Sequence, residues 1–347
     1  SISVLPGETD LIRGRLPFCG KIHEFRLAFR HSHLVSYLRM RKSRLMSAHP
    51  SYSCFFGSET MERLFLVDGH NLLFRMFYGM PPISAGDGTY MHAVVGCMGA
   101  LLRSIGMLSP TRMLVLFDSP DNGDRRSLCA DYKANRPDYS AMAPEDCPFT
   151  QLPLLYRTLS HSGIPYAEIH GCEADDAIAA YARQTPDDWD VVICSTDRDY
   201  FQLIDDRVSV FLYKGYDSSL VTPESVFARY GVSPDKFADF KCLVGDHSDN
   251  ITGVAGIGPK RAAVLLNRFG DLAGIRAHID EVPYPAVRRA LQEASPLLER
   301  NRALIALSGD APLPVDPALL AIDAGPLSRA SHMTLIRRAM EAESSLI

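Results

Sequence analysis

Residues 171–178 read GCEADDAI, and they place three acids, Glu173, Asp175 and Asp176, in the first turn of a predicted helix. One or two carboxylates suit the positive end of a helix dipole. Three within four residues repel one another unless cations lie between them. The stretch therefore predicts either a solvated turn or a site for divalent metal ions, which prefer oxygen ligands.

Four short apolar runs predict buried β-strands, at residues 64–67, 113–117, 165–169 and 191–194. Helix-like segments lie between or beside them, at residues 71–80, 92–108 and 156–161. Strands that alternate with helices predict an α/β fold with a mostly parallel central sheet flanked by helices. Ligands bind such sheets beyond the carboxyl ends of the strands.

Acids follow these strands at the ends where such a ligand would bind. Asp68 follows the first strand, Asp118 the second and Asp197 the fourth, while the third strand leads into GCEADDAI. A single Asp at such a position is more often a helix N-cap or a turn former. Four coincidences on one sheet edge favour a shared metal site instead.

A second region begins near residue 222. Residues 225–230 and 235–244 predict short helices, and the acidic turn GDHSDN follows at 245–250. Next comes GVAGIGPK at 253–260, ahead of a predicted helix at 261–269. Glycines before a helix expose main-chain N–H groups at its positive end, which predicts a phosphate-binding loop. An ordinary glycine-rich turn is the alternative, and Lys260 favours the phosphate site. Beyond residue 271 the chain shows no motif, and its arginines predict a solvated helical face.

Charge is unevenly distributed along the 347 residues. The net charge is −5, whereas residues 1–60 hold nine basic and four acidic residues. The acidic remainder argues against simple electrostatic binding of nucleic acid, unless acids gather around metal ions that reverse the local sign.

The 8 cysteines show no CxxC spacing, which disfavours zinc and disulfides and indicates a reducing compartment. No apolar run reaches the ~18 residues of a membrane helix, so we expect no membrane partner.

Seven motifs along the chain resemble one family in order and spacing. They are VDGHNLLFR, LFDSPDNGDRR, DYKANRP, GCEADDAI, STDRDYFQL, GDHSDNITGV and GIGPKRA. Together they resemble the 5'-nuclease family, which comprises flap endonucleases and the 5'-3' exonuclease domain of bacterial DNA polymerase I. The resemblance runs from about Phe65 to Gly270, and more loosely to about Pro314. It implies a PIN-like 5'-nuclease fold with a helical arch and a C-terminal helix-hairpin-helix (helix-three-turn-helix) region.

The resemblance also implies how the chain is divided. We expect an α/β catalytic domain at 61–221, with the arch at about 121–151, and a DNA-binding region at 222–314. Residues 315–347 would form a C-terminal tail. Residues 1–60 are expected to be disordered, an organellar targeting segment, or sequence upstream of a start at Met61, and these alternatives stay open.

By similarity, nine acids match the metal ligands of the family. Asp68, Asp118, Glu173 and Asp175 would hold one ion, and Asp197, Asp199, Asp246 and Asp249 would surround a second, with Asp176 between them. Two Mg2+ ions about 4 Å apart can hold both the attacking and the leaving oxygen of a phosphodiester. Mn2+ is expected to substitute, because it prefers the same oxygen ligands.

Basic and aromatic residues of the arch and of the first helix match positions that contact DNA in this family. Lys133 and Arg136 stand three apart, on one face of the expected helix, and would stabilise charge at the scissile phosphate. Arg125 and Arg126 would guide the single strand. Tyr78, with Phe77, would stack on a terminal base, and core packing is the alternative for both aromatics.

The glycine-rich loop matches the element that grips the duplex backbone in this family. Its expected DNA contacts are Gly256, Ile257, Gly258, Pro259, Lys260 and Arg261. Some relatives hold K+ there through main-chain carbonyls, and the matching positions are Leu243, Val244, Thr252, Val254 and Ile257. Thr252 departs from the usual proline.

We therefore expect a monomeric, Mg2+-dependent, structure-specific nuclease that acts on DNA with a free 5' end, flap or nick in replication and repair. A cytoplasmic, nucleoid-associated location is expected, with organellar targeting by residues 1–60 left open. The alternatives are a non-catalytic DNA-junction binding protein and an RNA-directed nuclease of the PIN type. Intact carboxylates argue against the first, and the helix-hairpin-helix argues against the second.

Overall fold

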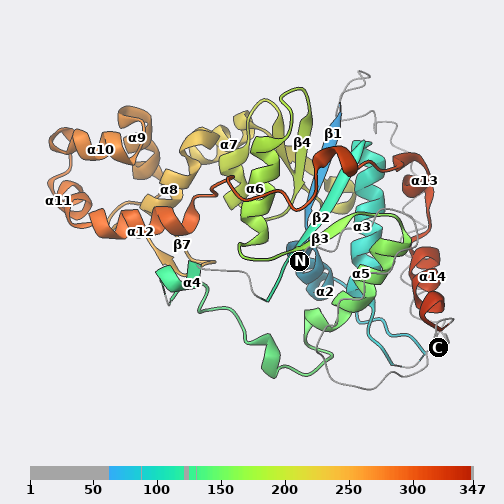
Figure 1. Cartoon of the computed structure of the whole chain (residues 1–347). Helices are drawn as coiled ribbons and strands as arrows, with labels where there is room; N and C mark the ends of the chain where they lie inside the picture. The colour runs from blue at the N-terminus through green and yellow to red at the C-terminus, as the bar shows by residue number, and fades with distance from the viewer. Residues whose placement is uncertain (1–61, 87, 121–124, 130, 345–347) are drawn as a thin grey trace.

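A mostly parallel six-stranded sheet lies at the centre of the molecule (Figure 1). The computed structural model describes residues 62–86, 88–120, 125–129 and 131–344. The strand order is β3-β2-β1-β4-β5-β6, and only β6 runs antiparallel to its neighbour. The strands are β1 (Arg63–Asp68), β2 (Arg112–Asp118), β3 (Tyr166–Ile169), β4 (Asp190–Cys194), β5 (Val208–Leu212) and β6 (Ser219–Val221). This confirms the predicted fold class, although β5 and β6 were not among the predicted strands.

The central strands are buried on both faces, which is why they appear in the sequence as continuous apolar runs. In β1, Phe65 and Val67 face α2 (Gly69–Gly79), α3 (His92–Leu108) and α5 (Leu152–His161). Leu64 and Leu66 face the opposite side, where α6 (Ala174–Gln184) packs. Successive side chains of a strand point to opposite faces of the sheet, so the buried side chains form two cores, one on each face. Packing of these two cores fixes the position of the sheet edge where the acids lie.

The second half of the chain forms a helical lobe beside α6, seen at the left of Figure 1. It contains α7 (Pro223–Tyr230), α8 (Phe237–Val244), α9 (Pro259–Phe269), α10 (Leu272–Ala277), α11 (Pro285–Glu293), α12 (Ser295–Ile305) and the short hairpin β7 (Gly245–Asp246) and β8 (Ile251–Thr252). One cluster of buried side chains runs from the sheet through α6 into this lobe. The predicted domain limits at 61–221 and 222–314 therefore stay predictions.

Two further helices follow the lobe and pack beside the sheet. They are α13 (Ala324–Arg329), against α3, and α14 (His332–Ser344), against α5 and α3. Short 3₁₀ helices complete the described chain: η1 (Tyr139–Ala141), η2 (Pro148–Gln151), η3 (Asp199–Leu203), η4 (Gly215–Asp217), η5 (Pro234–Lys236), η6 (Ile279–Glu281) and η7 (Pro317–Leu319). None of the helices in the described ranges is long and apolar enough to cross a membrane. The extension at 1–60 lies outside the described residues.

The segment expected to form the arch crosses from α4 (Arg125–Leu128) to α5, beneath the sheet in Figure 1. Its described part is mostly turns. Lys133 has a left-handed φ of 56°, and the Arg136 N–H donates to its carbonyl at 3.1 Å. Pro137 follows, and a proline disfavours helix at the residue before it. The single helical face expected for Lys133 and Arg136 is therefore wrong: the two residues lie at the two ends of one hydrogen-bonded turn.

Candidate functional site

The first group of acids lies where β1 and β2 end. The Asp68 carboxylate caps α2 by accepting from the Asn71 N–H at 2.9 Å, and the Ser195 hydroxyl donates to its other oxygen at 3.0 Å. Asp118 accepts from the Ala174 N–H at 2.8 Å, at the first turn of α6. Asp68 is therefore the N-cap of α2, which was the alternative to a metal ligand. The same carboxylate is also close enough to Asp118 for their charges to repel. One sheet edge brings both acids to the N-terminus of α6.

Like charges interact strongly within this group. Burial, together with the charges of Asp118 and Asp197, raises the pKa of Asp68 to about 6, against the opposing effect of the Asn71 and Ser195 hydrogen bonds. Burial and the charges of Asp68 and Asp197 likewise raise the pKa of Asp175 well above its usual value. Carboxylates that oppose one another's ionisation in this way are stabilised by a bound cation.

A second group of acids comes from η3 and from the β7–β8 hairpin. Asp199, Asp246 and Asp249 each offer a carboxylate oxygen, and these oxygens lie within 4.8 Å of one another. Asp199 and Asp249 are buried. Burial raises the pKa of Asp199 to about 7 even though Lys241 beside it lowers that pKa. An all-oxygen set of this kind fits Mg2+ or Mn2+ better than softer metals.

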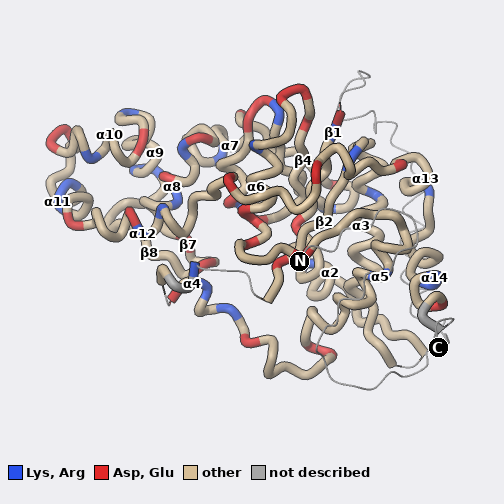
Figure 2. The backbone as a smooth tube through the Cα atoms, viewed as in Figure 1, with Lys and Arg blue, Asp and Glu red and all other residues tan. Residues whose placement is uncertain are grey.

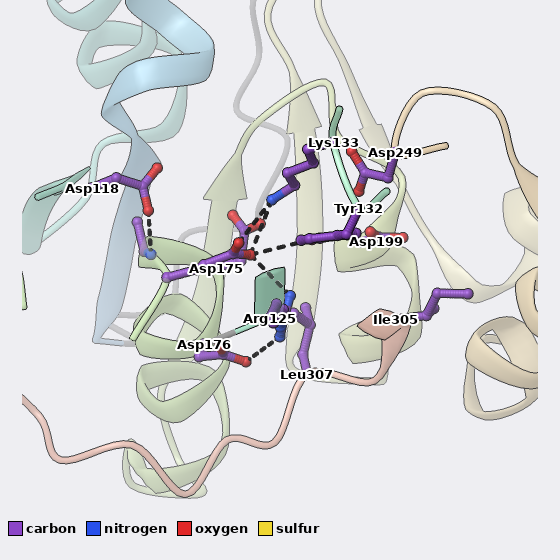
Figure 3. Close-up of polar contacts among 12 residues, drawn as sticks. Asp118, Arg125, Tyr132, Lys133, Asp175, Asp176, Asp199, Asp249, Ile305 and Leu307 are labelled. Carbon is purple, nitrogen blue, oxygen red and sulfur yellow. Dashed lines mark hydrogen bonds and ion pairs between the residues drawn. The ribbon is translucent and has the colours of Figure 1, made fainter. Parts of the chain in front are cut away.

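Basic residues of the arch segment reach the acids of α6 (Figure 3). Arg125 donates to Glu173 at 3.0 Å and to Asp176 at 2.6 Å. Lys133 Nζ lies 3.0 Å from both carboxylate oxygens of Glu173. Burial by itself lowers the pKa of Lys133, but the charges of Glu173, Tyr132 and Asp175 outweigh burial and raise that pKa. These cations and a divalent ion therefore compete for the same oxygens.

Arg136 binds the second group of acids. Its guanidinium donates to Asp249 at 3.0 Å, and the Lys133 main-chain N–H donates to the Asp249 carbonyl at 3.1 Å. The arch segment thus contacts both acid groups at once. Figure 2 shows its basic segments at and just below α4, near β7. The side chain of Arg126 lies outside the described part of the structure.

Lys241 is a site residue that the sequence reasoning missed. Its ammonium is buried and binds both Asp199 and Asp246. The available signal was a lone lysine in a largely apolar helix, five residues before Asp246. Tyr200 was also missed: it follows Asp199 directly, and its hydroxyl donates to Asp175. Both residues hold acids in place from within the protein.

The predicted DNA-binding loop is exposed at the start of α9. Lys260 and Arg261 line a shallow surface hollow with Gly258 and Pro259, and Arg261 donates to the Gly256 carbonyl at 2.6 Å. Gly256 has a φ of 78°, a conformation that favours glycine. The loop therefore presents main chain and positive charge together, and Ile257 behind it is buried.

Some of the carbonyls expected to hold K+ already accept a hydrogen bond from a main-chain N–H. The Val254 N–H donates to the Leu243 carbonyl at 2.8 Å, and the Ile257 N–H donates to the Val254 carbonyl at 3.0 Å. Each carbonyl keeps a second lone pair, so the site, with Val244 and Thr252, stays a prediction. The two aromatics of α2 expected to stack on a base differ: Tyr78 is 61% exposed, whereas Phe77 is 7% exposed and belongs to the core. Stacking on a base stays a prediction for Tyr78.

Comparison with known proteins gives consistent matches over most of the chain. The family model of the 5'-3' exonuclease N-terminal resolvase-like domain matches residues 63–231, and that of the 5'-3' exonuclease C-terminal SAM fold matches residues 232–325. The 5'-3' exonuclease of Aquifex aeolicus is 35% identical over 216 residues, which are 62% of this chain and 72% of that protein. DNA polymerase I of Thermus thermophilus is 35% identical over 259 residues, 74% of this chain but 30% of the polymerase. The chain thus spans about a third of the length of the polymerase relatives.

Solved structures of a bacteriophage T5 nuclease share the fold. A 5'-exonuclease with bound zinc has a TM-score of 0.56 and 26% identity, covering 82% of this chain and 99% of that chain. A flap endonuclease in complex with DNA and metal ions has a TM-score of 0.57 and 25% identity, covering 82% of this chain and all of that chain. Metal-bound neighbours and the acid cluster together indicate that this protein uses divalent metal ions.

The fold, with one acid group where β1 and β2 end and a second on η3 and the β7–β8 hairpin, is shared with these T5 nuclease structures. With both domain models matched in order, and a relative of 35% identity covered over 72% of its length, this chain belongs to the 5'-3' exonuclease family. The family resemblance, the fold and the hydrolase class expected from the sequence are confirmed.

Proposed function

We propose that this protein hydrolyses phosphodiester bonds at the 5' end of branched or nicked DNA, as a structure-specific exonuclease and flap endonuclease that depends on Mg2+. The observation that carries the proposal is the joining of both acid groups by the arch segment. Lys133 and Arg125 bind the α6 acids, while Arg136 binds Asp249. Cations and acids within one site suit a reaction that needs both metal ions and charge stabilisation at a phosphate.

The acids would hold two ions in the grouping expected from the family. Asp68, Asp118, Glu173 and Asp175 would surround the first ion, Asp197, Asp199, Asp246 and Asp249 would surround the second, and Asp176 would lie between them. Mg2+ or Mn2+ bound there would supply an ionised water and counter the negative charge of the phosphate. The protein's part is to fix the carboxylates through Ser195, Asn71 and Tyr200.

Lys133 and Arg136 would stabilise charge on the scissile phosphate. A phosphate in the site offers them anionic oxygens in place of Glu173 and Asp249, so each side chain can exchange one acid partner for another. Arg125 is half-buried between Glu173 and Asp176, and it would both guide the strand and hold the arch at α6. Tyr78 would stack on a terminal base.

The lobe would bind the duplex on the other side of the site. The main-chain N–H groups of Gly256 and Gly258, with Lys260 and Arg261, would grip phosphates without reading sequence. K+ bound by the nearby carbonyls would support that loop. The proposal also includes that the protein acts as a monomer in replication and repair, at a cytoplasmic, nucleoid-associated location.

A substrate comparison tests the function directly. The full chain is incubated with 5'-labelled flap DNA, flap RNA and linear duplex DNA, with Mg2+ and with EDTA, and products and bound fractions are measured together. Cleavage of the DNA flap in Mg2+ only is expected. Binding of the flap without cleavage would show a junction-binding protein, and preferential cleavage of RNA would show a PIN-type ribonuclease.

A further inference from the structure

Helix α12 lies in the region where the sequence shows no motif, yet one of its residues is the most buried asparagine of the helical lobe. Asn301 is 0% exposed. Its amide donates to two main-chain carbonyls, those of Cys242 at 3.2 Å and Thr252 at 2.8 Å. A buried side-chain amide with this geometry cross-links the segments that it contacts.

These two carbonyls flank the acidic hairpin. Cys242 belongs to the last turn of α8, where carbonyls lack partners within the helix, and Thr252 ends β8. The chain between them carries Asp246 and Asp249. Asn301 therefore holds both ends of the hairpin that presents the second group of acids.

The C-terminal end of α12 contacts the segment that carries Asp199. The Gln202 amide donates to the Asp199 carbonyl at 2.8 Å and to the Ile305 carbonyl at 3.0 Å. The Leu307 N–H donates back to the Gln202 side-chain oxygen at 3.0 Å. Figure 3 shows Ile305 and Leu307 on the chain that leaves α12 beside these acids.

The same stretch also reaches α6. Arg183, in the last turn of α6, donates to the Ser308 and Leu307 carbonyls at 2.8 and 3.1 Å. Three acid-bearing elements, namely the β7–β8 hairpin, η3 and α6, are thus tied to residues 301–308. These segments are far apart in sequence, so a common attachment fixes their spacing.

From these contacts we infer that α12 is the strut that sets the distance between the two groups of acids, with Asn301 and Gln202 as positioning residues for the metal ions. The inference rests on the proposed metal-dependent function. Neither residue touches a metal ion or a phosphate in this account. Each acts by holding the main chain beside Asp199, Asp246 and Asp249.

The variants Asn301→Leu and Gln202→Met test this inference, because they keep similar size, remove the amide donor and add no charge. Each has a matched control elsewhere. Asn267 donates to the Gly231 carbonyl at 2.7 Å, far along α9 from the loop, so Asn267→Leu controls for the first. Gln184 donates to the Gly309 and Ala311 carbonyls at 3.0 and 3.1 Å, so Gln184→Met controls for the second.

Three quantities are measured on each full-length variant: Mn2+ affinity by calorimetry without DNA, the Mg2+ concentration for half-maximal flap cleavage, and flap affinity in EDTA. Residues that orient metal ligands change metal affinity by about 10–100-fold, and we expect about tenfold for both test variants because they act through the main chain. Both metal quantities should move together, with flap affinity in EDTA and both controls unchanged. A merely structural role would lower thermal stability without this shift.

Wild-type Mn2+ affinity in folded Asn301→Leu and Gln202→Met would overturn the inference. Gln202 is only half-buried, so Gln202→Met decides the matter if Asn301→Leu does not fold. Failure of the proposed function is a separate result: wild-type protein would then bind Mn2+ without cutting any flap, or would bind no Mn2+ at all. The ratio of Mn2+ affinity between variant and wild type tests the role of α12, whereas flap cleavage by the wild type tests the proposed function.

Discussion

At the scale of single residues, the site depends on carboxylates that are close enough to raise one another's pKa. Asp68, Asp175 and Asp199 all show this effect, and each is also held by a neighbouring donor, Ser195, Tyr200 or Lys241. The acids themselves could be found from sequence because they follow strands. The donors could not, because their partners are up to 132 residues away and only the folded sheet brings them together.

Asp197→Asn should lower the rate of flap cleavage by more than about 100-fold, because even residues that only support metal ligands change activity by about 10–100-fold. Flap affinity should stay close to wild type. Asp188→Asn, an exposed substitution of the same kind between α6 and β4, serves as the control. Loss of binding together with turnover would show that Asp197 is needed for folding and is no ligand.

Lys133→Ala should lower the cleavage rate far more than flap affinity, by about 10²–10³-fold, as expected for a group that stabilises charge in the transition state. Single-turnover rates and equilibrium binding in EDTA separate the two effects. A change confined to affinity would assign Lys133 to guiding the strand.

At the scale of elements, the arch segment and the start of α9 have different tasks. The sequence predicted the arch as a helix from its family likeness. The described residues instead form the short helices α4, η1 and η2 with turns between them, since Pro137 and the left-handed Lys133 interrupt a continuous helix. What holds the segment is a set of ion pairs with α6 and with Asp249, and such long-range pairs have no signature in local sequence.

Lys260→Ala should weaken binding of flap DNA without changing the single-turnover rate at saturating enzyme. Lys260 is exposed at the start of α9, where its ammonium is available to a DNA phosphate. Loss of one phosphate contact should also reduce the slope of log affinity against log salt by about one. Equal slopes for variant and wild type would show that Lys260 does not contact the DNA backbone.

At the scale of the whole molecule, the two acid groups lie on segments that the sheet and α12 bring together from residues 68 to 249. This closeness has a cost, because the carboxylates repel one another. Mg2+ should therefore stabilise the folded chain, by about 2.7 kcal/mol when its concentration is 100 times the dissociation constant. Thermal unfolding with Mg2+ and with EDTA measures this difference. Asp175→Asn should show a smaller response, and an equal response would place the ion elsewhere.

The sequence was sufficient for the parallel sheet and for the acids at its strand ends, because buried apolar runs and the acids that follow them are local patterns. The full set of nine metal ligands came from the family resemblance and stays a prediction. The sequence was not sufficient for β5, although four of its five residues are apolar, for β6, which has only three residues, or for Asn301 and Gln202. The last two act by binding main chain about 50 to 100 residues away. Only the packed molecule shows such contacts.

The most direct test of the central claim is a time course of product release from a 5'-labelled DNA flap by the full chain. With Mg2+, the account predicts release of a short labelled fragment at the junction, and with EDTA it predicts a bound but intact flap. Cleavage at the same rate in EDTA would contradict the account, as would an intact flap in saturating Mg2+.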